Sequence, residues 1–290
     1  MVDAVTDVNR EPTARFSDRV DDYIRYRPGY PVEVVRTLER ELGIRADRTR
    51  IVDIGSGTGI SADLFLREGY AVVGVEPNAA MRVAAESRLA SPVGAASEHP
   101  EGWDFPGSSQ PRFRSVEGSA ESTTLPDACA DLVIAAQAFH WFDVARARRE
   151  MVRLLGKDGA VALMWNDRLV GENPFLQKYD EALRRWSIDY AQVNHQNLSD
   201  DDIGSFFGPL GCELRTFAQH QDFDWEGLLG RALSSSYVPL EGQPGHDELV
   251  AALRKLFDDH AKEGRVRFEY DTKLYFGRLS SLPRAHAEGT

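Results

Sequence analysis

The 290-residue chain has few cysteines, no run of basic residues and an excess of negative charge. Its two cysteines, Cys129 and Cys212, lie far apart and form no C-x-x-C pair, which favours a reduced, cytoplasmic protein over a disulfide-stabilised one. Lys and Arg total 34 against 46 Asp and Glu, giving a net charge of −12. Because a carboxylate-rich surface repels phosphate backbones, we expect no nucleic-acid partner.

Targeting signals, membrane segments and metal-ligand spacings are also missing from the sequence. The polar segment 1–16 lacks the apolar core of a secretory signal. No apolar stretch approaches the ~20 residues that a membrane span requires, so we expect no membrane association. The histidines are scattered without ligand spacing, and no metal site is predicted. The length fits one large α/β domain with additions, or a core domain with a cap.

The most informative segment that is present reads IVDIGSGTG, at residues 51–59. An apolar run ends at Asp53, and glycines follow at positions 55, 57 and 59. Glycine has no Cβ, so it suits a sharp turn between a strand and a helix and lets a ligand approach the backbone closely. Glu76 ends the next apolar run, where a carboxylate can accept both hydroxyls of a ribose. The pattern predicts a nucleoside-binding crevice; the alternative is a strand–turn–helix without a ligand.

The glycine spacing also indicates which kind of nucleoside fits. A dinucleotide-binding turn reads G-x-G-x-x-G and places a pyrophosphate at the start of the helix. Here the spacing is G-x-G-x-G, and no Lys or Arg lies between Gly55 and Leu66. The turn therefore suits a ligand without phosphates. S-adenosylmethionine meets that requirement, since its ribose needs the acid and its methionine end needs close backbone approach.

These two segments resemble the first and second motifs of the class I S-adenosylmethionine-dependent methyltransferases, with Glu76 matching the acid of the second strand. The N-terminal element FSDRVDDYIRYRPGYP, at residues 16–31, resembles a flap of the type 11 group. Within that group the chain is similar to trans-aconitate-methyltransferase-like small-molecule methyltransferases. The resemblance covers residues 16–166 and implies S-adenosylmethionine as cofactor and S-adenosylhomocysteine as product.

Alternating strand and helix patterns predict an α/β fold with a parallel sheet covered by helices on both faces. Strands are expected at 50–54, 71–75, 112–117, 131–136, 159–165, 212–223 and 266–276. Helices are expected at 31–42, 60–68, 79–89, 144–155, 173–190, 200–207, 225–235 and 247–263. The segment 91–111, rich in Gly, Pro and Ser, is expected to form an irregular surface insertion. The resemblance implies a Rossmann-like seven-stranded, mostly parallel sheet with an antiparallel final strand, to which a helical lid is added.

We expect four parts along the chain. Residues 1–45 form an N-terminal helical flap, and 46–167 form the S-adenosylmethionine-binding core. Residues 168–210 form a helical lid insertion, and 211–290 complete the core sheet.

The expected cofactor contacts come from the flap, the glycine turn and the ends of successive strands. Arg27, fixed between Tyr26 and Pro28 in the flap element, is expected to pair with the methionine carboxylate; the alternative is a surface arginine beside a helix-breaking proline. The resemblance places Ser119 where the family usually carries an aspartate toward the adenine; the alternative is an ordinary polar turn. Asp53 either supports the turn or contacts the methionine amino group, and Met81 either packs on the adenine or belongs to the helix core. The full expected set is Tyr23, Arg27, Asp53, Gly55, Ser56, Gly57, Glu76, Pro77, Met81, Ser119, Ala120 and Gln137.

His140 is the predicted catalytic base, because it follows the fourth strand among aromatic residues and imidazole titrates near neutrality. The alternative is a packed, hydrogen-bonded histidine. Aromatic side chains are expected to surround a planar or apolar acceptor beneath the lid. The expected acceptor contacts are Tyr30, Trp141, Trp165, Asn166, Trp186 and Tyr237.

The sequence thus predicts an enzyme that methylates a small organic molecule, with an aromatic or indole-like natural product of secondary metabolism favoured. O-, N- and C-methylation all stay open, as does the oligomeric state. One alternative is an NAD(P)-dependent oxidoreductase, which shares the glycine turn and the ribose acid. The other alternative is a non-catalytic protein that binds S-adenosylmethionine.

Overall fold

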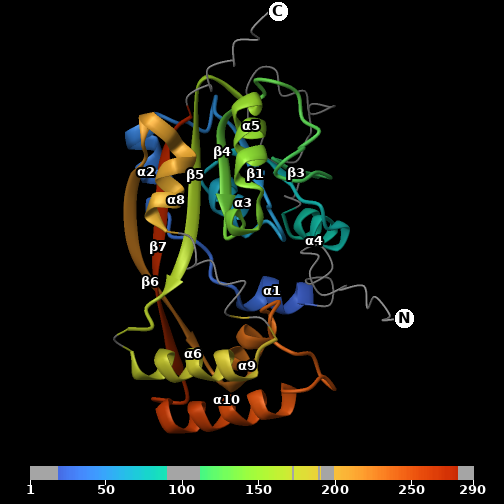
Figure 1. Cartoon of the computed structure of the whole chain (residues 1–290), viewed down its shortest axis with the longest axis vertical. Helices are drawn as coiled ribbons and strands as arrows, with labels where there is room; N and C mark the ends of the chain where they lie inside the picture. The colour runs from blue at the N-terminus through green and yellow to red at the C-terminus, as the bar shows by residue number, and fades with distance from the viewer. Residues whose placement is uncertain (1–18, 90–111, 172, 189, 191–198, 280–290) are drawn as a thin grey trace, which may run out of the picture.

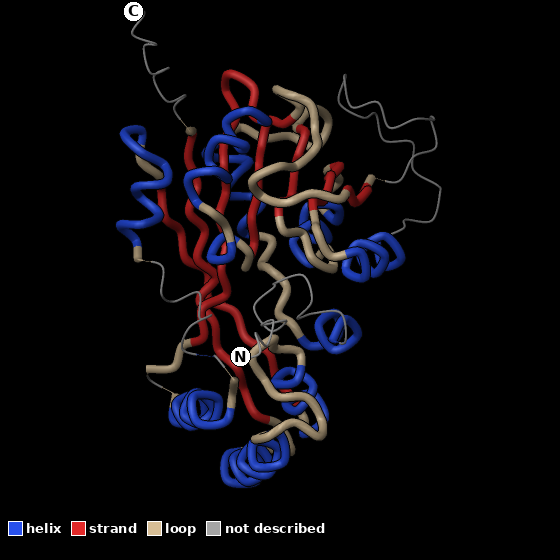
Figure 2. Tube along the Cα trace, turned by 45° about the vertical axis from the view of Figure 1, so that its right-hand side comes forward, coloured by secondary structure: helices blue, strands red, loops and turns tan. Residues whose placement is uncertain are grey.

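The computed structural model describes residues 19–89, 112–171, 173–188, 190 and 199–279. In Figure 1 these residues form a core built on a sheet and, below it, a smaller lobe of helices, which we call the lid. The insertion expected at 91–111 lies outside the described residues. The two lobes are joined by long strands that leave the core sheet and continue into the lid (Figure 2).

The core sheet has seven strands in the order β3-β2-β1-β4-β5-β7-β6. β1 to β5 run parallel to one another, whereas β7 is antiparallel to both β5 and β6. The prediction of a seven-stranded, mostly parallel sheet with an antiparallel final strand is therefore confirmed. The strands are β1 (Arg50–Ile54), β2 (Ala71–Val75), β3 (Phe113–Val116), β4 (Ala130–Ala136), β5 (Leu155–Arg168), β6 (Glu213–Phe223) and β7 (Val266–Arg278).

Helices cover both faces of the sheet because neighbouring strand residues point to opposite sides. In β1, Ile51 packs with α2 (Glu33–Leu42), α3 (Ile60–Arg67) and α4 (Ala79–Leu89). The next residue, Val52, packs on the other face with α5 (Val144–Leu154) and α8 (Asp200–Phe207). The central strands are apolar on both sides for this reason.

The lid is built from α6 (Pro174–Trp186), α9 (Trp225–Leu233) and α10 (His246–His260), which pack around the far ends of β6 and β7. β6 and β7 have 11 and 13 residues, long enough to serve the core at one end and the lid at the other. The expected lid segment 168–210 is consequently divided in space. α6 belongs to the lid, whereas α8 buries Phe206 and Phe207 in the core. The C-terminal segment in turn contributes α9 and α10 to the lid.

The N-terminal flap helix, α1 (Val20–Tyr26), docks on the lid through α9. Gly230 makes this approach possible, because a Cβ there would lie 2.0 Å from Cε2 of Tyr26. Arg19, just before α1, donates hydrogen bonds to the carbonyl oxygens of Leu233 (3.0 Å) and Val238 (2.5 Å). The bond to Leu233 satisfies a carbonyl at the end of α9 and places a positive charge at the negative end of its dipole.

None of the helices in the described part of the chain combines the length and the apolar character needed to cross a bilayer.

Phe268 should be a principal source of lid stability. Its ring is fully buried, with centroids 5.0–5.3 Å from those of Tyr179, Phe175 and Phe223. A Phe268→Ala substitution removes these contacts and leaves a cavity, so we expect it to lower the free energy of unfolding by about 3–5 kcal/mol. Urea denaturation monitored by fluorescence measures the change.

A Val83→Ala variant is the control, because Val83 on α4 is 67% exposed and should change stability by less than about 0.5 kcal/mol. Equal losses in the two variants would contradict the assignment of Phe268 to the lid core.

Candidate active site

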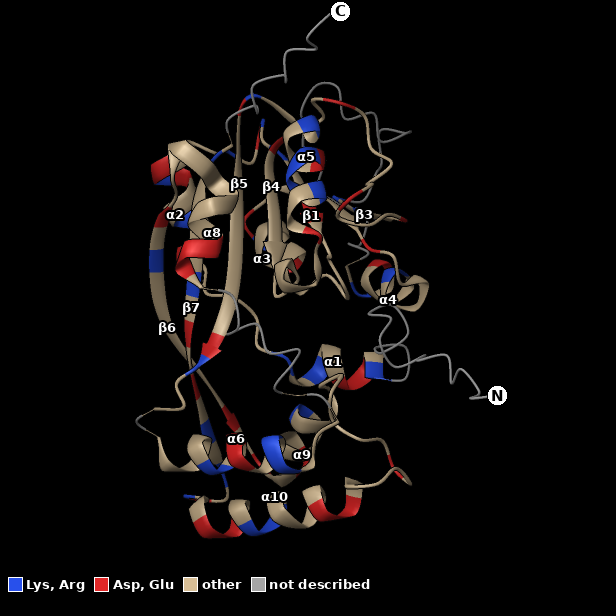
Figure 3. Ribbon diagram, viewed as in Figure 1, with Lys and Arg blue, Asp and Glu red and all other residues tan. Residues whose placement is uncertain are grey.

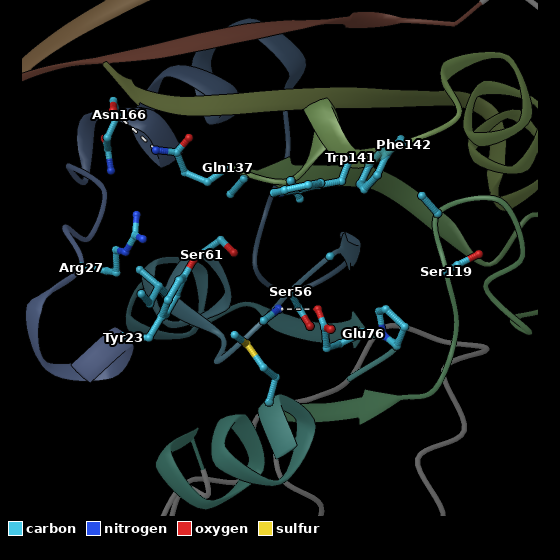
Figure 4. Close-up of a pocket in the computed structure, with 18 of the residues that line it drawn as sticks. Tyr23, Arg27, Ser56, Ser61, Glu76, Ser119, Gln137, Trp141, Phe142 and Asn166 are labelled. Atoms are coloured by element: carbon cyan, nitrogen blue, oxygen red, sulfur yellow. Dashed lines mark hydrogen bonds between the residues drawn. The ribbon is translucent and has the colours of Figure 1, made fainter. Parts of the chain in front are cut away.

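A cavity of about 300 Å³ lies at the carboxyl ends of β1, β2 and β4 and is bounded on another side by the flap (Figure 4). This is the point where the strand order reverses, with β2 on one side of β1 and β4 on the other. Open α/β sheets bind ligands at such a point, and the volume lies at the small end of the usual range for small-molecule sites. The predicted cofactor residues that line the cavity are Tyr23, Arg27, Gly55, Ser56, Gly57, Glu76, Pro77, Met81, Ser119, Ala120 and Gln137.

The glycine turn after β1 packs closely against neighbouring segments, and the backbone amides of Gly55 and Ser56 are not free to bind a ligand. Gly55 has φ +69°, and a Cβ at this position would lie 2.6 Å from Cβ of Ala138. The amides of Gly55 and Ser56 both donate to the carbonyl oxygen of Val75, at 2.8 and 3.2 Å. These bonds tie the turn to the end of β2. Gly55 thus allows the turn to pack against Ala138, and the amides of Gly55 and Ser56 are already used within the protein.

Glu76, at the end of β2, is held by two backbone amides. Oε2 accepts from the amide of Gly57 at 3.0 Å, and Oε1 accepts from that of Asn78 at 2.9 Å. A carboxylate oxygen has two lone pairs, so each oxygen retains one for a ligand hydroxyl. Burial raises the pKa of Glu76, while the two amides partly oppose that rise. The side chain is thus fixed in orientation and can still accept two hydrogen bonds.

Asp53 does not line the cavity; it supports the cavity from beneath. It is fully buried and accepts a hydrogen bond of 2.6 Å from Oγ of Ser61, a residue that does line the cavity. Burial raises the pKa of Asp53 to about 7; the Ser61 hydrogen bond opposes this shift, and the nearby Glu76 carboxylate adds to it. Of the two roles expected for Asp53, its position supports the structural one.

Gln137, at the end of β4, has a strained backbone. Its φ is +54°, an uncommon value for a residue other than glycine, and its amide donates to the carbonyl oxygen of Met164 at 2.9 Å. Strain of this kind clusters at ligand sites, where surrounding structure enforces it. Its Oε1 is buried and accepts no hydrogen bond within the described residues, so it is available to a donor in the cavity.

Arg27 and Asn166 lie at the end of the cavity away from Ser119 (Figure 4). Arg27 donates through Nε to Oγ of Ser234 (3.1 Å) and through Nη2 to the carbonyl oxygen of Ser234 (3.0 Å). Nη2 also donates to Oγ of Ser235 (3.2 Å), and no hydrogen bond to another described residue uses Nη1, so Nη1 can serve a ligand. Asn166 is occupied on both sides: Nδ2 donates to the carbonyl oxygen of Gly29 (3.0 Å), and Oδ1 accepts from Thr272 (2.6 Å). Asn166 therefore anchors the flap to the sheet.

Of the other predicted acceptor and catalytic residues, Tyr30 and Trp141 line the cavity. Trp165 does not, because it precedes Asn166 in β5 and so points to the opposite face, where it packs against Phe139. Trp186 and Tyr237 pack in the lid. His140 is not part of the lining, so its role as a base rests on the sequence prediction alone.

Several lining residues were not singled out from the sequence. Ser61 follows the glycine turn by two positions, and Glu121 directly follows Ala120. Proximity in sequence to a predicted contact was the available signal for these residues. Pro28, Ile60, Ala136 and Ala138 also belong to the lining, as does Phe142, one of the aromatic residues around His140. No three His, Cys, Asp or Glu side chains gather as metal ligands in the described ranges.

The arrangement can be compared with known proteins. Residues 52–163, which run from β1 into β5, match the sequence model of the family described as "Methyltransferase domain". This match places a methyltransferase domain at residues 52–163. The family resemblance inferred from the glycine turn and Glu76 is confirmed.

Individual relatives agree with this assignment. An uncharacterised methyltransferase of Mycobacterium tuberculosis is 32% identical over 159 residues, which is 55% of this chain and 55% of that protein. The match thus spans about half the length of this relative. A methyltransferase-like protein of Schizosaccharomyces pombe is 29% identical over 67% of this chain and 68% of its own length. A protein of Anaeromyxobacter dehalogenans described as a type II methyltransferase has the same fold, with a TM-score of 0.59 and 23% identity over 88% of this chain and 100% of that one.

The raised pKa of Asp53 predicts a specific pH dependence of stability. The carboxyl group titrates near pH 3.8 when unfolded and near pH 7 when folded, so between these values the folded state holds a proton that the unfolded chain releases. The stabilisation is complete below the lower value and is lost as the pH rises through the upper one. Relative to Asp53→Asn, the free energy of unfolding of the wild type should therefore fall by up to about 1.4 kcal/mol per pH unit.

Urea denaturation of both proteins at several values between pH 4 and pH 8 tests this expectation. Parallel stability curves over that range would show that Asp53 does not titrate as its burial requires.

Proposed function

We propose that this protein transfers a methyl group from S-adenosylmethionine to a small organic acceptor. The observation that carries the proposal is the pairing of Glu76 with a glycine turn that has no Lys or Arg in residues 55–66. The acid offers two free acceptor positions to a ribose, and the turn offers space without a positive charge for phosphate. This combination favours an adenosine derivative that lacks a pyrophosphate.

The lining fits the two ends of such a ligand. Ser119 and Glu76 lie at one end of the cavity and suit the adenosine, whereas Arg27 lies at the other and suits a carboxylate (Figure 4). Oε1 of Gln137, which accepts no hydrogen bond from another described residue, suits an ammonium group. When bound, the cofactor supplies a methyl group on a positively charged sulfur. The side chains have to align the acceptor and exclude water, and strong acid–base catalysis is optional.

The positions of the aromatic residues bear on which methyl acceptor the site can bind. Tyr30 and Trp141 line the cavity and support a planar or apolar acceptor. Trp165, Trp186 and Tyr237 do not line it, so the preference for an aromatic or indole-like natural product rests on less than the sequence implied. A place in secondary metabolism stays an inference from the sequence, and so does the choice among O-, N- and C-methylation.

Calorimetric titration with S-adenosylhomocysteine and, separately, with NADH tests the proposal against both alternatives. We expect heat with S-adenosylhomocysteine only. Glu76→Ala removes two acceptor positions and a charge, so it should weaken S-adenosylhomocysteine binding by roughly 1.5–3 kcal/mol, or about 10- to 150-fold in Kd. Methyl transfer to a panel of small acceptors then separates an enzyme from a protein that only binds the cofactor.

Glu117→Ala is the matched control. Glu117 follows β3, its side chain is 80% exposed, and it does not line the cavity, so the Kd should not change. Binding of NADH alone, or an unchanged Kd in a folded Glu76→Ala variant, would refute the proposal.

A further inference from the structure

The lid contains arginines that the cofactor cavity does not use. Arg168 is the last residue of β5, and its side chain is 12% exposed. Arg231 lies on α9 and is 5% exposed. Arg27 comes from the flap and is close enough to Arg231 for their charges to interact, as Arg231 is to Arg168. Figure 3 shows Lys or Arg on each of α1, α6 and α9, the helices around this region.

In the guanidinium group of Arg168, Nη2 has partners among the described residues, whereas Nη1 has none. Nη2 donates to the hydroxyl of Tyr190 at 2.5 Å and lies 3.6 Å from Oδ1 of Asp180. The guanidinium also lies over the ring of Tyr179, with Cζ 5.1 Å from the centroid. Nη1 is buried and makes no hydrogen bond within the described residues.

Arg231 and Tyr179 also have unused polar atoms. Nη1 of Arg231 makes only a long bond of 3.4 Å to Oγ of Ser235, and Nε makes none among the described residues. No carboxylate of the described ranges lies within 4.0 Å of Arg231. The hydroxyl of Tyr179, a fully buried residue, has no hydrogen-bond partner there either.

Among the residues that the structure describes, the buried arginines of the lid outnumber the carboxylates that contact them. Asp180 is the carboxylate next to Arg168, but it also accepts from Nε of Arg184 at 2.6 Å and from the hydroxyl of Tyr190. Burial and the proximity of Arg231 lower the pKa of Arg27. Burial alone would raise the pKa of Tyr237, but Arg168, Arg27 and Arg231 together lower it. A buried charge without a partner is costly, so an added anion would stabilise this cluster.

We propose that Arg168, Arg231 and the hydroxyl of Tyr179 form an anion site in the lid that binds a carboxylate or phosphate group of the methyl acceptor. The two vacant arginine atoms can only donate hydrogen bonds, and the hydroxyl can donate as well. An oxygen anion can accept hydrogen bonds from donors of this kind and supplies a negative charge. A neutral ligand satisfies the bonds but leaves the charges uncompensated. Guanidinium groups bind carboxylate and phosphate well because their paired N–H groups match two oxygens.

The position of Arg27 links this site to methyl transfer, so the inference rests on the proposed function. Arg27 lines the cofactor cavity, and its charge interacts with Arg231 in the lid. Arg168 and Arg231 themselves do not line that cavity. The proposed anion site is therefore beside the cofactor cavity, next to Arg27, rather than inside it. The acceptor class that follows is a small organic acid or phosphate ester.

Thermal denaturation of the full chain, with and without saturating S-adenosylhomocysteine, tests the anion site. The probes are succinate and inorganic phosphate, with succinamide as the uncharged match for succinate. We expect at least one anion to raise the Tm and succinamide to leave it unchanged; the more effective anion identifies carboxylate or phosphate as the group recognised. Arg168→Met, Arg231→Met and Tyr179→Phe should each raise the Kd of that anion about tenfold or more.

The variants also separate a binding role from a structural one. Tyr179→Phe removes a hydroxyl that makes no hydrogen bond among the described residues, so the fold should be retained. Arg231→Met removes an uncompensated charge, so without added anion its Tm should equal or exceed that of the wild type. Arg254→Met is the control, because Arg254 is 52% exposed and pairs with Asp258 on α10.

Three results would overturn the anion site. The first is that neither anion raises the Tm of the wild type. The second is that the anion raises the Tm of the folded variants as much as that of the wild type. The third is that the variants lose affinity for S-adenosylhomocysteine while the anion still raises their Tm. The last result would assign the arginines to the cofactor instead. An anion shift in a protein that does not bind S-adenosylhomocysteine would support the anion site while refuting the proposed function.

Discussion

The site depends on the close approach of two backbone segments at the carboxyl edge of the sheet. At Gly55 a Cβ would lie 2.6 Å from Cβ of Ala138, so glycine alone allows the turn after β1 to contact the segment after β4. The amide of Gly55 meanwhile bonds to Val75 at the end of β2. One turn thus fixes the ends of three strands. Glu76 and Gln137, which follow β2 and β4, are held at the same cavity as a result.

The core could be predicted from the sequence because its signals are local. Strands buried on both faces are apolar runs, and each is followed by a glycine, a cap or a helical pattern. The lid could not be predicted in the same way. α8 and α9 are both short amphipathic helices, and nothing in their own sequences says which lobe they join. That choice follows from the reach of β6 and β7, whose far ends carry α9 and α10 away from the core.

In the candidate site, too, the residues with a local sequence signal were predicted and the others were not. Contacts near the glycine turn and the strand ends were predicted, since a strand end fixes where the next residue lies. Both Trp165 and Asn166 were expected to face the cavity. Adjacent residues of a strand point to opposite faces, however, and β5 continues past both residues to Arg168. Arg231 had no signal at all. Its importance comes from being buried near Arg168 and Arg27, which are far from it in sequence.

Hydrogen bonds from two arginines, Arg27 and Arg19, hold the flap against the lid. Arg27 closes one end of the cofactor cavity and bonds to Ser234 just after α9, and Arg19 bonds to Leu233 nearby. These bonds favour packing of the flap on the lid, since they satisfy carbonyl oxygens at the end of a helix. The same packing brings Arg27 toward Arg231, which opposes it electrostatically. An anion bound by the lid arginines, as proposed above, would reduce that repulsion and so favour the packing of the flap on the lid.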